Sequence, residues 1–247
     1  MAKRIILFLI LNSIVLISLF AQDQRMSDAN IAYLNGDYQT AIRLYEALIA
    51  DGVQDANVYF NLGNAYYEAG QPGFALVNYR RAQQIAPRDE QINANITLIR
   101  AIRVDFQGSE SYWLDSLAMS TYTILTLQEL GLIALIIWGI FFIALSCRFW
   151  GYQWLNRWLI LIGVFALMLI PLFGGRYYAD KHRPPAVITA LSAPVRSGPS
   201  ESYLVMYELF SAAEVRVLDI KNSWVRITEP NGREGWIPRT AITLIHE

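Results

Sequence analysis

The spacing of hydrophobic residues changes twice along this chain, and each spacing predicts a different kind of element. Across Asp23–Arg103, apolar residues recur at intervals typical of helices that bury one face. Two later runs, Leu130–Cys147 and Trp158–Gly175, each hold eighteen residues without a charge. From Ala186 onward, short stretches alternate between apolar and polar residues, as strands do. The pattern therefore predicts a multidomain chain: all-α helical repeats, a two-helix apolar hairpin and a small all-β barrel.

The helical region repeats its small and aromatic residues with a period of 34. Three residues of the first copy correspond to three of the second: Gly36, Ala41 and Tyr45 recur as Gly70, Ala75 and Tyr79. This period is typical of helix–turn–helix units that stack side by side. Pro72 follows Gly70 closely, which predicts that one helix ends and another begins there. Pro87 is predicted to stop the second helix of that unit.

The second copy carries a nearly complete repeat signature: Tyr59, Leu62, Gly63, Tyr66, Ala75, Tyr79, Ala82 and Pro87. On these residues the region 22–105 resembles a tetratricopeptide repeat (TPR) array, a module that binds peptides and proteins. The first copy, roughly 22–55, is weaker, because Ala29 and Ala32 stand where the second has Gly63 and Tyr66. Asp89–Arg103 is predicted to form a capping helix. A small helical array with only a packed core is the alternative interpretation.

The TPR resemblance implies a peptide-binding groove lined by the first helix of each repeat. It assigns six residues to that groove: Asn30, Tyr33, Phe60, Asn61, Asn64 and Tyr67. Asn30 and Asn61 have the relative placement of the asparagine pair in carboxylate-clamp TPRs. The basic residues of such a clamp are replaced by Met26, Gln91 and Asn95. We therefore expect an uncharged, internal peptide segment as the ligand, with a merely solvated polar face as the alternative.

The N-terminus has the layout of a secretory signal peptide. Lys3 and Arg4 precede sixteen mostly apolar residues, Ile5–Phe20, and Ala21 follows. This predicts a signal peptide over 1–21, with an uncleaved anchor as the alternative. In either case the repeats would be exported.

The two apolar runs are predicted to be transmembrane helices over 130–147 and 158–175, since each is long enough to cross a hydrocarbon layer of about 30 Å. Aromatic residues at the ends of the runs are typical of membrane interfaces: Tyr122, Trp150, Tyr152, Trp154, Tyr177 and Tyr178. Residues 106–129 would form a juxtamembrane segment and 148–157 a short linker.

The orientation of this hairpin follows mainly from the predicted export of the N-terminus. Arg148 and Arg157 in the linker favour the cytoplasm, whereas Arg176, Lys181 and Arg183 after the second run argue the other way. We expect a multi-pass protein of the bacterial inner membrane. Its linker would be cytoplasmic, and both soluble domains would lie on the periplasmic or extracytoplasmic side.

Region 184–247 is predicted to form a set of short strands joined by turns. The strand-like stretches are Ala186–Leu191, Val215–Leu218, Trp224–Ile227 and Gly235–Ile237, with turns at Ser197–Ser200 and Pro230–Gly232. Together with Val195–Ser200, these stretches resemble a bacterial SH3-like (SH3b) domain. Members of this family often sit at the cell envelope and bind wall peptides or proteins. Where the family has a glycine before the middle strand, this chain has Ala212-Ala213-Glu214.

Four aromatic residues of this region are candidates to line a binding groove: Tyr203, Tyr207, Trp224 and Trp236. For each of them, packing in the core is the alternative, because these rings bury large areas.

The composition offers little for catalysis. The chain has one cysteine, two histidines and a net charge of −1, so it has no Cys/His cluster and no basic patch for nucleic acid. It carries no phosphate-binding glycine loop and no nucleophile or metalloprotease motif. We therefore expect no enzyme activity, no cofactor, no metal site and no nucleic-acid partner.

The order of signal peptide, TPR array, two spans and SH3-like domain resembles the BatE-type components of bacterial aerotolerance (Bat) operons. This resemblance implies a scaffold for membrane proteins, including partners with von Willebrand A-type domains. One alternative is a wall-sensing protein whose SH3-like domain binds peptidoglycan peptides. Another is an accessory that regulates an enzyme through the membrane hairpin.

Overall fold

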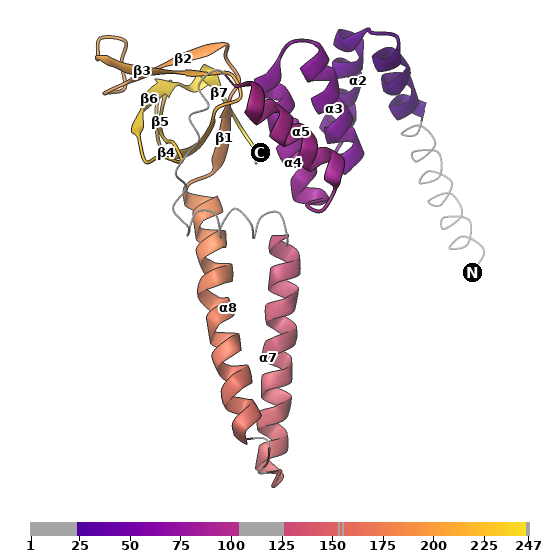
Figure 1. The fold of residues 1–247 in the computed structure, drawn as a ribbon, viewed down its shortest axis with the longest axis vertical. Helices are drawn as coiled ribbons and strands as arrows, with labels where there is room; N and C mark the ends of the chain where they lie inside the picture. The colour runs from indigo at the N-terminus through magenta and orange to yellow at the C-terminus, as the bar shows by residue number, and fades with distance from the viewer. Residues whose placement is uncertain (1–23, 104–125, 153, 155, 246–247) are drawn as a thin grey trace, which may run out of the picture. The chain divides into compact units, whose positions relative to one another are not determined.

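The computed structural model describes residues 24–103, 126–152, 154 and 156–245. It confirms the predicted fold class, with a helical TPR-like region, two long apolar helices and a C-terminal antiparallel sheet (Figure 1). The predicted signal peptide, 1–21, and all but the last few residues of the juxtamembrane segment, 106–129, lie outside the described residues.

The repeat region is a run of short helices whose starts are capped by aspartate or proline. Residues 24–34 are helical, and they precede α2 (Tyr38–Ala50), α3 (Ala56–Glu68), α4 (Pro72–Ile85) and α5 (Glu90–Ile102). Asp37, Asp55 and Asp89 each accept a hydrogen bond from a backbone N–H in the first turn of the helix that follows. Pro72 occupies the first turn of α4, where its missing N–H costs nothing.

The glycines of the 34-residue period end the first helix of each repeat. Gly36 and Gly70 have φ of +77° and +74°, a left-handed conformation that glycine adopts without a Cβ clash. At Gly70, the backbone N–H donates to the Tyr67 carbonyl at 3.0 Å, and the next N–H donates to the Tyr66 carbonyl at 2.9 Å. This is a glycine C-cap, and it turns the chain into the second helix.

The two helices of the second repeat approach closely at a glycine. A Cβ built on Gly63 of α3 would lie 2.6 Å from the Tyr79 ring of α4, closer than atoms can pack. The buried residues of α2, α3 and α4 include alanines, leucines and the two period-related tyrosines: Ala41, Tyr45, Leu48, Leu62, Ala75, Leu76, Tyr79 and Ala82. The small residues of the repeat signature thus permit the helix contact, and the large ones fill the space beside it.

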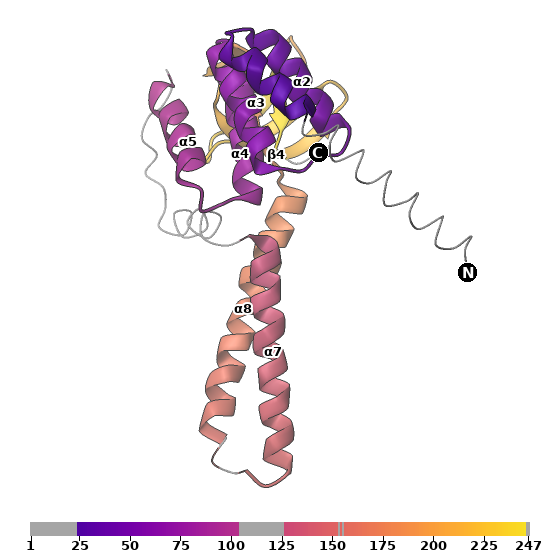
Figure 2. The same cartoon turned by 90° about the vertical axis from the view of Figure 1, so that its right-hand side faces the viewer.

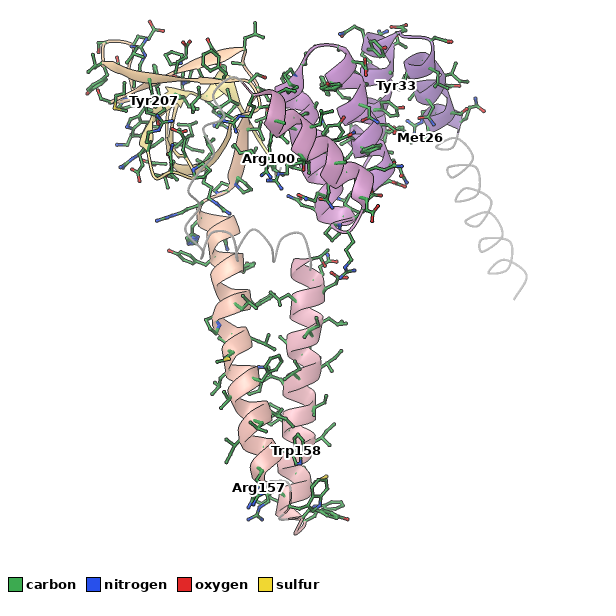
Figure 3. All side chains as sticks on the ribbon, in the orientation of Figure 1. Met26, Tyr33, Arg100, Arg157, Trp158 and Tyr207 are labelled. Atoms are coloured by element: carbon green, nitrogen blue, oxygen red, sulfur yellow. The ribbon has the colours of Figure 1, made fainter. Side chains whose placement is uncertain are left out.

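Two long helices, α7 (Leu127–Phe149) and α8 (Asn156–His182), lie side by side (Figure 2). A Cβ on Gly131 would lie 3.3 Å from the Phe173 ring, and one on Gly163 would lie 3.1 Å from the Phe141 ring. Arg157 and Trp158 lie at the end of the hairpin where the two helices are joined (Figure 3).

Both helices are long and apolar enough to cross a membrane, over Gln128–Phe149 and Asn156–Gly175. Their outward surfaces are apolar as well: Leu135 is 72% exposed and Met168 is 66% exposed. A core helix of a soluble domain would bury such side chains, so the exposure favours a lipid environment over a protein interior.

The C-terminal region forms one seven-stranded sheet in the order β3-β2-β6-β5-β4-β1-β7. Its strands are β1 (Pro185–Ile188), β2 (Ser192–Arg196), β3 (Val205–Phe210), β4 (Glu214–Lys221), β5 (Trp224–Thr228), β6 (Glu234–Pro238) and β7 (Ile242–Leu244), with a 3₁₀ turn, η2 (Arg239–Ala241), before the last. Val225 and Ile227 are buried, and Val225 pairs with Ile237 of β6. The alternation predicted for β5 therefore sets which of its side chains enter the core.

The turn before β4 forms although the family's glycine is missing. Ala212 takes φ of +68°, a left-handed conformation that is unfavourable for a residue with a Cβ. The Ala213 N–H donates to the Phe210 carbonyl at 3.1 Å, and both alanines are buried. The departure from the family pattern is therefore accommodated at the backbone, and the turn stays tight.

Candidate partner-binding site

A hydrogen-bonded cluster joins the first repeat to the second. The Asn30 side-chain oxygen accepts a hydrogen bond from the Tyr45 hydroxyl at 2.7 Å and another from the Asn61 amide at 3.2 Å. Tyr45 lies on the second helix of the first repeat, and Asn61 lies on α3, the first helix of the second repeat. The cluster therefore links three helices in succession.

The same cluster recurs 34 residues later. The Asn64 side-chain oxygen accepts from the Tyr79 hydroxyl at 2.7 Å and from the Asn95 amide at 3.0 Å. Each of these three residues stands 34 positions after its counterpart in the first cluster. The α5 helix is thereby joined to α3 and α4 in the way that α3 is joined to the helices before it.

A hollow of about 150 Å³ opens beside the second cluster. It is lined by side chains from the helix at 24–34 and from α3, α4 and α5: Tyr33, Asn64, Tyr67, Glu68, Tyr79, Asn95, Leu98 and Ile99. Tyr33 is labelled in Figure 3. Four of these residues belong to the first helices of the two repeats, which line the groove in TPR proteins, and three belong to α5, which follows the second repeat.

The six predicted groove residues divide into two sets. Tyr33, Asn64 and Tyr67 line the hollow together. Asn30 and Asn61 bond directly to each other, and the Phe60 ring packs on the Tyr79 ring with centroids 5.7 Å apart. Partner binding by any of the six stays a prediction, and the structure gathers three of them at one surface.

Five further residues of the hollow were not among the predicted groove residues: Glu68, Tyr79, Asn95, Leu98 and Ile99. Asn95 has a signal in the sequence, because it stands 34 residues after Asn61. Glu68 follows Tyr67 near the end of α3, and nothing in the spacing marks it as part of a site. Leu98 is 46% exposed on α5, so it offers apolar surface at the hollow.

The electrostatic character of the hollow is negative. Among the described residues that line it, Glu68 alone carries a formal charge, and its side chain is exposed. Burial raises the pKa of the Tyr33 hydroxyl, and the negative charge of Glu68 raises it further. Burial raises the pKa of Tyr79 as well, with Tyr33, Tyr67 and Glu68 acting in the same direction and a hydrogen bond from Asn95 opposing them.

The predicted aromatic residues of the SH3-like domain lie in separate contacts. The Tyr203 ring covers Gly198, where an added Cβ would lie 2.7 Å from it. Tyr207, labelled in Figure 3, packs under the Arg233 guanidinium with 4.4 Å from its carbon to the ring centroid. Trp236 is 8% exposed, and the Lys221 ammonium lies 5.4 Å from its ring centroid.

Trp224 is half-buried at the start of β5 and pairs with Pro238. A hollow of about 100 Å³ on this domain is lined by other residues: Val217, Ile220, Val225, Arg239, Ile242, Thr243 and Leu244. This hollow does not bring the four aromatic residues together, so their role in binding stays a prediction.

No group of acidic, cysteine or histidine side chains in the described part of the chain is arranged to hold a metal ion. The hollow beside Asn64 offers amide and hydroxyl groups for hydrogen bonding, aromatic surface and one negative charge, and these groups suit recognition of a peptide.

Comparisons with known proteins identify both modules. Residues 191–243 match the family model described as bacterial SH3 domain, and residues 56–89 match the one described as tetratricopeptide repeat. Tetratricopeptide repeat protein 16 of Homo sapiens is 29% identical over 88 residues, covering 33% of this chain and 10% of that protein. The protein of the same name from Macaca fascicularis is 29% identical over 68 residues, covering 28% of this chain and 8% of that protein.

The chain thus spans about a tenth or less of the length of these curated relatives. The matches confirm the TPR and SH3-like resemblances of the two regions. Both modules are typical of proteins that bind other molecules, which supports a binding or scaffold role.

Proposed function

We propose that this protein is a non-catalytic, membrane-anchored scaffold that binds protein partners through its TPR array and its SH3-like domain. The observation that carries the proposal is the hollow formed by Tyr33, Asn64 and Tyr67 on helices of successive repeats. A surface shared between repeats can hold an extended peptide, since hydroxyl and amide groups there can pair with its backbone.

In this proposal α7 and α8 anchor the chain in the bacterial inner membrane as a hairpin. Their length, their apolar composition and their exposed apolar side chains support the anchor. Export by the signal peptide predicted at 1–21 would leave both soluble domains on the extracytoplasmic side. The bacterial SH3 match over 191–243 supports that side, because such domains often act at the envelope.

The proposed partners are membrane proteins, including ones with von Willebrand A-type domains, in a Bat-type envelope complex. Support for this finer assignment comes from the order of the domains along the chain. The alternative, an accessory that regulates an enzyme through the hairpin, would have the same domains. In that case neither soluble domain would bind the partner without α7 and α8.

The proposal is tested by native purification of the tagged, full-length protein in mild detergent. Tyr67→Ala removes an aromatic wall of the hollow, whereas Tyr59→Ala changes a tyrosine of the same helix that does not line it. We expect a von Willebrand A-type membrane protein to co-purify with the wild type and with Tyr59→Ala, and to be lost with Tyr67→Ala. Equal recovery with both variants would exclude the hollow as the contact.

Asn30 and Asn64 are unsuitable for this test, because each accepts two hydrogen bonds that join the repeats. Their removal would perturb the array itself, so lost binding would not identify a contact.

The match to the bacterial SH3 family also favours a second function, binding of peptidoglycan peptides. Co-sedimentation of the detergent-solubilised full chain with purified cell-wall sacculi tests it. Binding that is reduced by Trp224→Ala and unchanged by Tyr67→Ala would support a wall-binding protein. Absence of co-sedimentation would exclude it.

A further inference from the structure

We infer that the hollow beside Asn64 accepts a positively charged side chain, a lysine or an arginine, from an extended peptide of the partner. This inference rests on the proposed function, since it names the chemistry of the ligand that the TPR array would bind. It also revises the expectation of an uncharged peptide, which followed from the missing basic residues of the clamp and did not include Glu68.

The first argument is the charge of Glu68. Its carboxylate is exposed at the hollow, and it forms no ion pair with any residue that the structure describes. Other acids of the array are engaged: Glu46 accepts a hydrogen bond from Tyr66, and Asp51 pairs with Arg25. Glu68 is therefore available to an external cation, and it would repel a peptide carboxylate.

The second argument is the aromatic wall. Tyr33 and Tyr67 line the hollow on the helix at 24–34 and on α3, on the same surface as Glu68. The face of a phenol ring attracts an ammonium or guanidinium group within about 6 Å. A cation in the hollow would thus lie among one carboxylate and tyrosine rings, and among the described lining residues no cation competes with it.

The third argument is the size and composition of the remaining walls. Leu98 and Ile99 of α5 provide apolar surface for the methylene stem of a long basic side chain. The volume of about 150 Å³ is that of a cavity large enough for benzene, so a stem with its charged end fits. The Asn95 amide nitrogen donates to the Asn64 oxygen, which leaves the Asn64 nitrogen and the Asn95 oxygen to pair with the adjacent peptide backbone.

The test selects ligands from a displayed library of random peptides, using the full-length protein in detergent. Peptides retained by wild type and rejected by Tyr67→Ala bind at the hollow. We expect them to share one lysine or arginine. A selected peptide is then synthesised with that residue and with norleucine in its place, and the affinity of each is measured for wild type, Glu68→Gln and Glu90→Gln.

We expect Glu68→Gln to weaken binding of the basic peptide about 2- to 5-fold, within the range typical of one exposed ion pair. The norleucine peptide should bind wild type and Glu68→Gln almost equally, because norleucine carries no charge that could pair with the Glu68 carboxylate. Glu90→Gln neutralises an exposed acid at the start of α5 that does not line the hollow, and it should leave both affinities unchanged.

Peptides that depend on Tyr67 but lack a basic residue, with affinities unchanged by Glu68→Gln, would overturn this inference and leave the proposed function standing. A library that yields no peptide dependent on Tyr67 would overturn both the inference and a peptide-binding role for the hollow.

Discussion

The side-chain oxygens of Asn30 and Asn64 face helices of their own array. The carboxylate-clamp resemblance paired Asn30 with Asn61 as peptide-binding residues, but the Asn30 and Asn64 oxygens each accept hydrogen bonds from a tyrosine hydroxyl and from the amide of a later asparagine. The two clusters are equivalent by the 34-residue period, so they connect successive repeats in the same way. We infer that these asparagines chiefly hold the repeats in register.

Removing one hydroxyl tests this role. Tyr79→Phe deletes the 2.7 Å hydrogen bond to Asn64 and keeps the buried ring. We expect the array to lose about 1–2 kcal/mol of stability, because Asn64 loses a donor at a half-buried site. Hydrogen exchange of α3 and α4 amides in the full-length protein measures this loss. Tyr45→Phe should have a similar effect, and Tyr59→Phe should change stability by less than about 0.5 kcal/mol.

The buried phenols also predict a loss of stability at alkaline pH. Burial raises the pKa of Tyr45 to about 12, partly opposed by the Asn61 hydrogen bond, whereas an unfolded tyrosine titrates near 10. The unfolded state therefore releases this proton first, so the stabilisation is complete below about pH 10 and is lost as pH rises toward 12.

This pH dependence is measured by following hydrogen-exchange protection or helical circular dichroism of the full-length protein across that range. Tyr45→Phe should show a shallower decline than wild type between pH 10 and 12. Parallel curves for the two proteins would contradict the assignment of this phenol as one source of the effect.

Among the elements, those with a strong local pattern could be predicted. Ile92, Ile96 and Ile99 predicted α5 because they share one helical face, and all three are buried. The charge-free runs predicted α7 and α8, although α8 continues to His182, beyond the apolar stretch. Local spacing is sufficient where one face of an element, or all of it, is apolar.

Strands β2 and β3 were not predicted as strands from the pattern. Pro194 interrupts β2, and β3 exposes both Val205 and Met206 rather than alternating.

The hollow beside Asn64 was only partly predictable from the sequence, for a different reason. Its tyrosines and asparagines follow from the repeat. That Glu68 of α3 and Leu98 of α5 line one hollow depends on how these helices pack in the array, which the sequence of a single helix does not encode.

The contact between α3 and α4 yields a prediction at the scale of elements. In a helix interior, alanine is more favourable than glycine by about 1 kcal/mol, so propensity alone would make Gly63→Ala stabilising. The Tyr79 ring lies 2.6 Å from the position of the new methyl group, however, so the buried ring or the two helices must shift. We expect a net destabilisation of about 1–3 kcal/mol, seen as reduced amide protection in α3 and α4.

Gly139→Ala in α7 is the matched control, because nothing lies within 4 Å of the added carbon. It should leave the protection of α3 and α4 unchanged. A stabilising Gly63→Ala would show that propensity outweighs the contact between the two helices.

At the scale of the whole molecule, two binding modules flank a pair of apolar helices in one chain. If α7 and α8 span the membrane, an even number of crossings returns the chain to the side on which it entered. The TPR array and the SH3-like domain would then face the same compartment, where both could act on one partner. The orientation of the hairpin therefore decides which proteins are available to either module.

The single cysteine makes this orientation testable, because a Cys147→Ser background contains no other thiol. Tyr152→Cys places an exposed thiol at the turn of the hairpin, and Glu201→Cys places one on an exposed turn of the SH3-like domain. In cells with a permeabilised outer membrane, we expect an impermeant maleimide to label Glu201→Cys directly. Tyr152→Cys should react only after the inner membrane is opened, since the linker carrying Arg148 and Arg157 would be cytoplasmic. The reverse order of labelling would put both soluble domains in the cytoplasm and exclude extracytoplasmic partners for the hollow at Tyr67.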